Sequence, residues 1–164
     1  MPHAAGLSQL RWSNKPWKTT LNKPPFLLDV NTLVALTDEV HPHHRVAARW
    51  FATPGLEWGL CALTEAGLLR LSMHPRVGNL TLDEASAIVS DLSCHPGYRY
   101  WPITTGWADL TAPFRERVFG HQQITDAYLL GLAVRRNGVL VTFDKAIQFI
   151  AGPKYSQHVL VLES

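Results

Sequence analysis

Four carboxylates stand where an apolar segment of the chain ends or the next one begins. They are Asp29 in Leu-Asp-Val-Asn, Glu65 in Leu-Thr-Glu-Ala, Asp126 in Ile-Thr-Asp-Ala and Asp144 in Thr-Phe-Asp-Lys. A carboxylate among apolar neighbours loses much of its hydration, which is costly unless the group is paired or binds a metal. The four acids are therefore the first candidates for a chemical role.

Carboxylates that converge without histidine or cysteine partners favour a hard cation that prefers oxygen ligands, Mg²⁺ or Mn²⁺. Such ions bind the oxygens of a phosphate group, lower the pKa of a bound water and stabilise the leaving oxygen. The acids supply the negative charge that holds the metal, and without the metal they would repel the substrate. This set of residues thus predicts metal-assisted phosphoryl chemistry.

Each acid also has a purely structural interpretation. The Thr-Glu pair at 64–65 and the Thr-Asp pair at 125–126 look like helix N-termini, where an acid that interacts with the helix dipole contributes about 0.3–1 kcal/mol. Asp144 could cap a short helix that follows it. Asp29 is the hardest to explain in this way, because a carboxylate in a central strand is unfavourable.

The segments around the acids alternate between strand and helix patterns. Short apolar runs predict strands, and apolar residues at helical spacing predict the helices between them. Such alternation indicates a parallel sheet with helices on both faces, and ligands of these sheets bind beyond the carboxyl ends of the strands. The predicted strands are 26–30, 58–63, 98–101, 139–143 and 159–162, and the main predicted helices are 46–51, 68–73, 82–92 and 127–134.

Four motifs in this order resemble the motifs of the PIN domain, and their spacing resembles the VapC toxins of type II toxin–antitoxin modules. The resemblance covers about residues 26–162. It implies a three-layer α/β/α PIN-like fold with a central, mostly parallel sheet. The motifs are LLDVNTLVAL from Leu27, LTEA from Leu63, TDAYL from Thr125 and TFD from Thr142.

The resemblance implies a Mg²⁺-dependent endoribonuclease, with Mn²⁺ as the alternative ion. Asp29 would be the central metal ligand, and Asp126 and Asp144 would complete the site directly or through water. Glu65 would bind a second ion or position the attacking water, so the four acids together form the expected catalytic set. The residues expected to support the ligands are Asn31, Thr125 and Thr142.

Substrate and partners also follow from the resemblance. Members of this family cut structured RNA, commonly tRNA or ribosomal RNA, form homodimers, and are silenced by a VapB-type antitoxin that fills the acidic groove. No membrane segment is expected, because the longest apolar run, 128–134, is far shorter than the roughly 20 residues that span a bilayer. The two cysteines have no partner motif, which is typical of the reducing cytoplasm.

Basic residues are distributed unevenly along the chain. Four of the 15 lysines and arginines, and none of the acids, lie in residues 1–28, so the remainder is slightly acidic. We therefore predict a basic, flexible leader over residues 1–25 and the PIN domain over 26–164. Because phosphate contacts provide most of the affinity for RNA, we expect a few arginines of the domain to bind the backbone. These are Arg70, Arg76, Arg115 and Arg117.

Other function classes fit less well. An aspartyl-phosphate phosphatase would need Asp-x-Asp-x-Thr, where this chain has Asn31 and Leu33 in place of the second acid and the threonine. A phospho-receiver module needs an acidic pair near the end of the first strand, and Asp29 stands alone there. A non-catalytic interaction module, in which the acids only cap helices, remains the simplest alternative to an enzyme.

Overall fold

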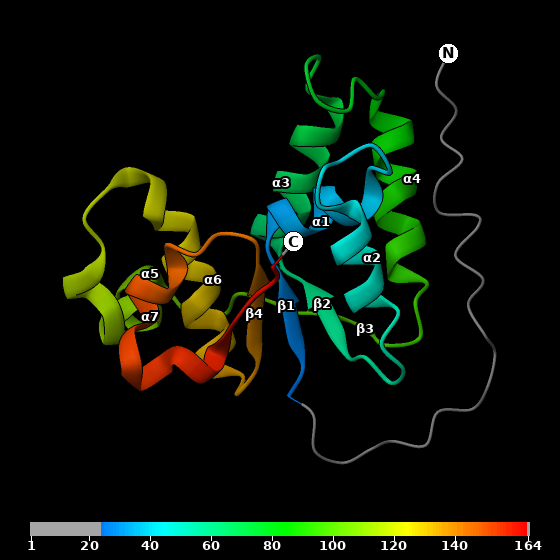
Figure 1. The fold of residues 1–164 in the computed structure, drawn as a ribbon. Coiled ribbons are helices and arrows are strands. Elements are labelled where there is room, and N and C mark those ends of the chain that lie inside the picture. Colours follow the sequence, from blue (N-terminus) through cyan, green and yellow to red (C-terminus); the bar gives the residue numbers. More distant parts are fainter. Residues whose placement is uncertain (1–23, 164) are drawn as a thin grey trace.

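A single parallel sheet forms the centre of the computed structural model, which describes residues 24–163 (Figure 1). The strand order is β3-β2-β1-β4-β5, and every neighbouring pair is parallel. Helices connect the strands, as parallel pairs require. The strands are β1 (Phe26–Leu28), β2 (Trp58–Leu60), β3 (Tyr98–Tyr100), β4 (Val139–Thr142) and β5 (Val159–Val161).

Helices cover both faces of the sheet. Helices α1 to α4 lie on one face, and α5, α6 and α7 lie on the other (Figure 1). This three-layer α/β/α arrangement confirms the fold predicted from the sequence. The helices are α1 (Val30–Thr37), α2 (His44–Phe51), α3 (Ala62–Met73), α4 (Leu82–Ser93), α5 (Trp107–Thr111), α6 (Ile124–Arg135) and α7 (Ile147–Tyr155), with 3₁₀ turns η1 (Ala112–Arg117), η2 (His121–Gln123) and η3 (Ser156–His158).

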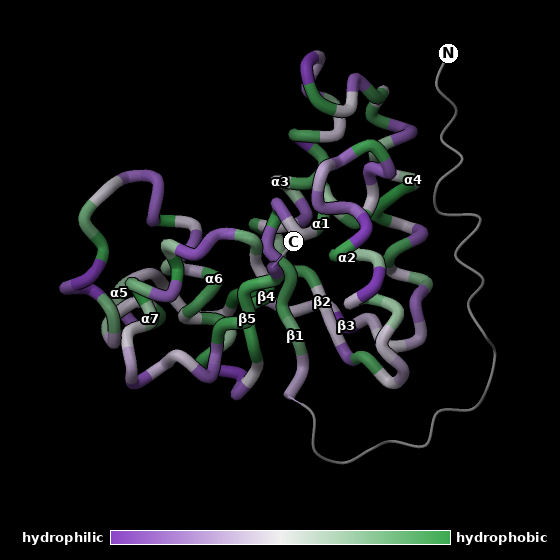
Figure 2. The backbone as a smooth tube through the Cα atoms, in the orientation of Figure 1, coloured by the Kyte–Doolittle hydropathy of each residue, from purple (hydrophilic) through white to green (hydrophobic). Residues whose placement is uncertain are grey.

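Two hydrophobic cores lie on the two faces of the sheet. The adjacent residues Leu27 and Leu28 are both fully buried, and because side chains alternate along a strand, they enter different cores. Leu27 packs with α6 and α7, and Leu28 packs with α1, α2 and α3. Burial on both faces explains why β1 and β4 are continuous apolar runs in the sequence, visible as green segments at the centre of Figure 2.

The structure differs from the sequence prediction after the first two strands. Helix α1 was not predicted, because its residues 32–36 are all buried and therefore show no alternation between polar and apolar faces. The predicted second strand, 58–63, ends at Leu60, since α3 already begins at Ala62. The short helix α5 was also not predicted. These changes place Glu65 inside a helix rather than just after a strand.

The predicted basic leader, residues 1–25, lies outside the described residues except for Pro24 and Pro25. Its boundary with the domain therefore stays a prediction. Over residues 24–163, none of the helices has both the length and the apolar character needed to cross a membrane.

Helix α6 packs closely against α5 at Gly131. A Cβ atom at this position would overlap the backbone carbonyl oxygen of Leu110 in α5. We expect Gly131→Ala to lower the free energy of unfolding by about 1–3 kcal/mol, because the two helix backbones must separate, even though alanine favours helix. Chemical denaturation measures this.

Gly106→Ala is the matched control, because a Cβ atom there meets nothing within 4 Å. It should change stability by no more than about 0.5 kcal/mol. Equal stability of the Gly131 variant and the wild type would contradict the close packing of α5 on α6.

Candidate metal centre

The topology of the sheet creates a switch point between β1 and β4. The chain leaves β1 toward β2 and β3 on one side, and leaves β4 toward β5 on the other. Asp29 directly follows β1, and Asp144 lies two residues beyond Thr142, the last residue of β4. In open parallel sheets, ligands bind beyond the carboxyl ends of the strands at such a switch point.

Asp29 is buried and held at both carboxylate oxygens. Its Oδ1 accepts a hydrogen bond from the backbone N–H of Thr32 at 2.6 Å, which makes Asp29 the N-cap of α1. Its Oδ2 accepts from the hydroxyl of Thr142 at 2.5 Å. The side chain is only 7% exposed. Backbone and side-chain donors thus fix the orientation of this carboxylate.

Thr142 connects Asp29 to Asp144. Its Oγ1 donates to Asp29 and accepts from the backbone N–H of Asp144 at 2.9 Å. The Oδ1 of Asp144 in turn accepts from the backbone N–H of Ala146 at 2.8 Å, just before α7 begins. One hydroxyl group therefore sets the geometry between the ends of two neighbouring strands.

Asp126 reaches the same place from the other helical layer. It is the third residue of α6 and is partly buried. Burial first, and then the charges of Asp144 and Asp29, raise the pKa of Asp126 to about 6. Three carboxylates from three separate segments therefore lie within electrostatic reach of one another.

The pKa of Asp29 is also raised. Burial is the largest influence and raises its pKa, and the negative charge of Asp144 acts in the same direction. Hydrogen bonds from Thr142 and Thr32 oppose this effect and lower the pKa. The fold thus holds negative groups together against desolvation and mutual repulsion, which is the condition that a bound cation relieves.

Glu65 is placed differently from the three aspartates. It lies in the first turn of α3, and its charge acts on Tyr98, whose pKa is raised by burial first and by Glu65 second. Glu65 is not among the charges that shift the pKa of Asp29 or Asp126. Its predicted role at the centre stays a prediction.

Of the three residues expected to support the ligands, the structure joins one to the centre. Thr142 bonds to Asp29, as described above. Asn31 and Thr125 are exposed on the first turns of α1 and α6, and neither side chain bonds to another residue within 24–163. Thr125 is not the N-cap of α6, since that position belongs to Gln123. Thr64 likewise lies inside α3, where its Oγ1 accepts from the backbone N–H of Cys61.

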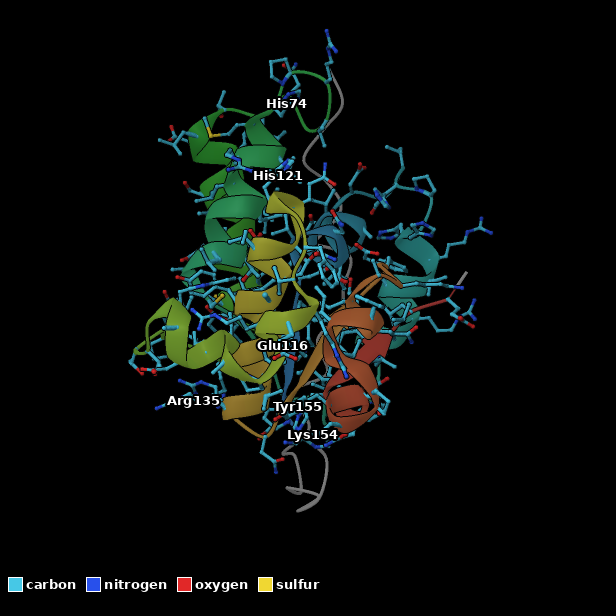
Figure 3. All side chains as sticks on the ribbon, turned by 90° about the vertical axis from the view of Figure 1, so that its left-hand side faces the viewer. His74, Glu116, His121, Arg135, Lys154 and Tyr155 are labelled. Atoms are coloured by element: carbon cyan, nitrogen blue, oxygen red, sulfur yellow. The ribbon has the colours of Figure 1, made fainter. Side chains whose placement is uncertain are left out.

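The four candidate arginines fall into two groups on opposite faces of the sheet. Arg70 is exposed on α3, and Arg76 is exposed in the loop that follows it. Arg115 and Arg117 belong to η1, in the layer of α5, α6 and α7. Figure 3 faces this second layer and labels Glu116, between these two arginines, and His121, just before α6.

Two residues near the centre were not singled out in the sequence. Thr32 donates its backbone N–H to Asp29, and its hydroxyl donates to the carbonyl of Val141 at 3.1 Å, which ties α1 to β4. An aspartate directly before the first residue of a helix is the capping signal that would have found this hydrogen bond. His43 stacks on Phe143, next to Asp144, with ring centroids 4.6 Å apart.

The donor set fits a magnesium-like ion. Among the residues that the structure describes, no three acidic, histidine or cysteine side chains are grouped closely enough to enclose a metal. Mg²⁺ does not need such a cage, since it keeps several waters and binds proteins through one or two carboxylates. Asp29, Asp126 and Asp144 offer only oxygen ligands, and burial first and neighbouring negative charge second raise the pKa of Asp29 and Asp126.

The hydroxyl of Thr142 should be important for stability. Thr142→Val removes the donor to the buried Asp29 carboxylate and the acceptor for Asp144, and we expect unfolding to become easier by about 1.5–3 kcal/mol. Thr111→Val is the control, because its buried hydroxyl only bonds back to Trp107 in its own helix. It should cost about 1 kcal/mol or less. Equal losses in the two variants would contradict the special role of Thr142.

The raised pKa of Asp126 predicts a pH dependence of stability without added metal. Its pKa rises from 3.8 to about 6 on folding, so the folded state binds the proton more tightly than the unfolded state. Below both pKa values, Asp126 is protonated in the folded and the unfolded state and does not make stability depend on pH. As pH rises from 3.8 to about 6, the folded state loses this proton less readily than the unfolded state, and stability falls.

Asp126→Asn should therefore gain stability relative to wild type between pH 4 and pH 7, by about 1–2 kcal/mol because partial exposure weakens the effect. Thermal unfolding in a metal chelator measures this difference. Asp109→Asn, at an exposed position of α5, is the control for the loss of one charge. A wild type and an Asp126 variant with parallel pH profiles would contradict the electrostatic coupling.

Comparisons with known proteins agree with this geometry. A family model described as the PIN domain matches residues 26–153. Ribonuclease VapC38 of Mycobacterium tuberculosis (strain ATCC 25618 / H37Rv) is 39% identical over 128 residues, which cover 76% of this chain and 89% of that protein. Ribonuclease VapC44 of the same strain is 36% identical over 140 residues, which cover 83% of this chain and 98% of that protein. The chain therefore belongs to the PIN-domain family, in its VapC branch.

Proposed function

We propose that this protein is the toxin of a VapBC-type module and cuts structured RNA, tRNA or ribosomal RNA, with the help of Mg²⁺ or Mn²⁺. It is an endoribonuclease, in keeping with its family and with relatives that are named ribonucleases. The observation that supports the metal requirement is the convergence of Asp29, Asp126 and Asp144, where burial first and neighbouring negative charge second raise the pKa of Asp29 and Asp126.

Each aspartate contributes in its own way. Asp29 would hold the ion with a carboxylate whose orientation is fixed by Thr32 and Thr142. Asp126 and Asp144 would complete the binding site directly or through water. When bound, a divalent cation makes a water molecule more acidic and neutralises charge on the phosphate.

The predicted site residues other than the three aspartates have supporting roles. Glu65 would position the attacking water or bind a second ion from the first turn of α3. Asn31 and Thr125, exposed at the starts of α1 and α6, would contact ligands or substrate from the solvent side. The arginines of the two layers would bind the RNA backbone, since phosphate contacts dominate affinity. They are Arg70, Arg76, Arg115 and Arg117.

We further propose a VapB-type antitoxin as the partner, a homodimer as the assembly and the cytoplasm as the compartment. The VapC names of the relatives support the antitoxin. An acidic centre also suits a partner that inserts a basic side chain, because the same charge that binds a cation attracts an arginine or lysine. Such a partner would compete with the metal and with the RNA.

Loss of the central charges should abolish cleavage. Asp29→Asn keeps a side-chain oxygen for the cap of α1 but removes the charge, and Asp126→Asn removes a second charge. We expect Mg²⁺- or Mn²⁺-dependent cleavage of tRNA and ribosomal RNA to fall by about 100-fold or more in both, because metal ions contribute several kcal/mol to such reactions.

Glu39→Gln, at an exposed position after α1, should retain wild-type activity. The thermal midpoint of the wild type should rise when Mn²⁺ is added, and this rise should be lost in the Asp29 variant. A wild type that neither cleaves RNA nor responds to either ion would instead favour a module in which the acids serve only as caps.

A further inference from the structure

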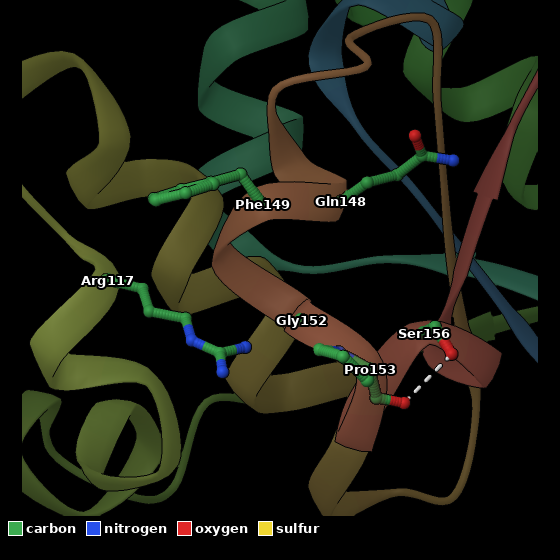
Figure 4. A pocket seen from close by; sticks show the side chains of 6 residues that line it. All are labelled: Arg117, Gln148, Phe149, Gly152, Pro153 and Ser156. Atoms are coloured by element: carbon green, nitrogen blue, oxygen red, sulfur yellow. Dashed lines mark hydrogen bonds between the residues drawn. The ribbon is translucent and has the colours of Figure 1, made fainter.

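A pocket of about 480 Å³ lies between η1 and α7, apart from the carboxylates (Figure 4). Its volume is within the range of small-molecule and cofactor sites, about 300–1,000 Å³. Arg117 enters it from η1, and the other lining residues belong to α7 and the turn that follows. The lining residues are Arg117, Gln148, Phe149, Gly152, Pro153 and Ser156.

The guanidinium of Arg117 lies directly over the backbone of Gly152. A Cβ atom at Gly152 would overlap Nη1 of Arg117, and Gly152 also has a positive φ of 57° that glycine adopts readily. Glycine therefore creates the space in which the guanidinium rests. Figure 4 shows Arg117 pointing from η1 toward this glycine.

Within residues 24–163, Arg117 forms no ion pair. The only salt bridge among the residues that the structure describes joins Lys145 to Glu163, and the guanidinium of Arg117 makes no hydrogen bond within 24–163. Its donors therefore face the pocket unused. A planar guanidinium with free donors is well suited to a phosphate group, which it can bind through two parallel hydrogen bonds.

An exposed aromatic pair borders the same pocket. Phe149 is 59% exposed and Phe119 is 77% exposed, although large apolar side chains are normally buried. Their ring centroids are 6.0 Å apart, with the ring planes inclined at 44°. Exposed aromatic rings beside a basic group are the elements on which single-stranded RNA bases stack.

The pocket also follows the carboxylate centre along the chain. Helix α7 begins three residues after Asp144, and Phe149 lies in its first turn. Gln148 and Ser156 add polar groups, and the Ser156 hydroxyl already donates to the carbonyl of Pro153 at 3.1 Å, so its oxygen remains available as an acceptor. An RNA strand that lies over the aspartates could therefore continue along α7 into this pocket.

We propose that this pocket binds one nucleotide of the RNA substrate next to the cleaved bond, which rests on the function proposed above. Arg117 binds the phosphate, and the ring of Phe149 stacks on the base. RNA fits better than a protein partner here, because an unpaired cation and an exposed ring together match a phosphate and a base.

Two variants test the pocket independently. Arg117→Gln removes the phosphate contact, and Phe149→Ser removes the stacking surface at an exposed position where folding should survive. Binding of a labelled single-stranded RNA to each variant, in an Asp29→Asn background that does not cleave, should weaken by about fivefold or more. The salt dependence of binding should fall by about one phosphate contact in the Arg117 variant only.

Matched controls share the chemistry but not the location. Arg135→Gln removes one exposed arginine at the end of α6, and Tyr100→Ser removes one exposed aromatic ring on β3. Both should bind RNA as the background protein does. In the cleaving protein, the two pocket variants should raise KM with little change in kcat, whereas Asp29→Asn loses kcat.

The outcomes separate the two proposals. If the wild type cleaves RNA but the pocket variants behave like their controls in binding and in KM, the pocket proposal is overturned and the nuclease stands. If the wild type neither binds nor cleaves RNA, both proposals fall. If binding weakens without a smaller salt dependence in Arg117→Gln, the assignment of Arg117 to a phosphate is wrong.

Discussion

The hydrogen bond from Thr142 to Asp29 is the contact on which the centre depends. It joins residues 113 positions apart and occurs where the two central strands of the sheet end together. Without it, a carboxylate that is almost fully buried would lose one of its two donors. The cost of leaving a buried charge unsatisfied is large enough to affect both the stability of the domain and the shape of the site.

The rest of the centre follows from that contact. The hydrogen bond from Thr32 at the start of α1 fixes the orientation of the Asp29 carboxylate. Asp144 and Asp126 therefore lie near a negative charge that cannot rotate away from them. Burial first, and then the charge of Asp144, raises the pKa of Asp29 and of Asp126 in the folded protein. A site that is unfavourable when empty is a site that gains more when a cation arrives. The same hydrogen bonds thus orient the carboxylates for a cation and hold their like charges close together.

Much of the fold could be predicted from the sequence because strands buried on both faces are continuous apolar runs. Helix α1 could not, because its burial on nearly all sides hides the helical period. Because parallel strands end at the same edge of a sheet, Asp29 and Asp144 could be predicted to lie near each other. That Asp29 also caps a helix, and that the charge of Glu65 acts on Tyr98, depends on contacts the sequence pattern does not contain. The pocket around Arg117 was beyond sequence reasoning, because it depends on a contact between η1 and a glycine in α7. Which aspartates bind metal stays a prediction.

The order of the segments has a consequence for how the protein is made. Asp29 is synthesised first, Thr142 follows 113 residues later, and Asp144 comes two residues after Thr142. Strand β4, which lies beside β1, must leave the ribosome before the two halves of the centre can meet. A nascent chain therefore carries Asp29 without its hydrogen-bond donor until Thr142 is added 113 residues later. The ribosome that makes this protein is not exposed to a finished centre until β4 has emerged.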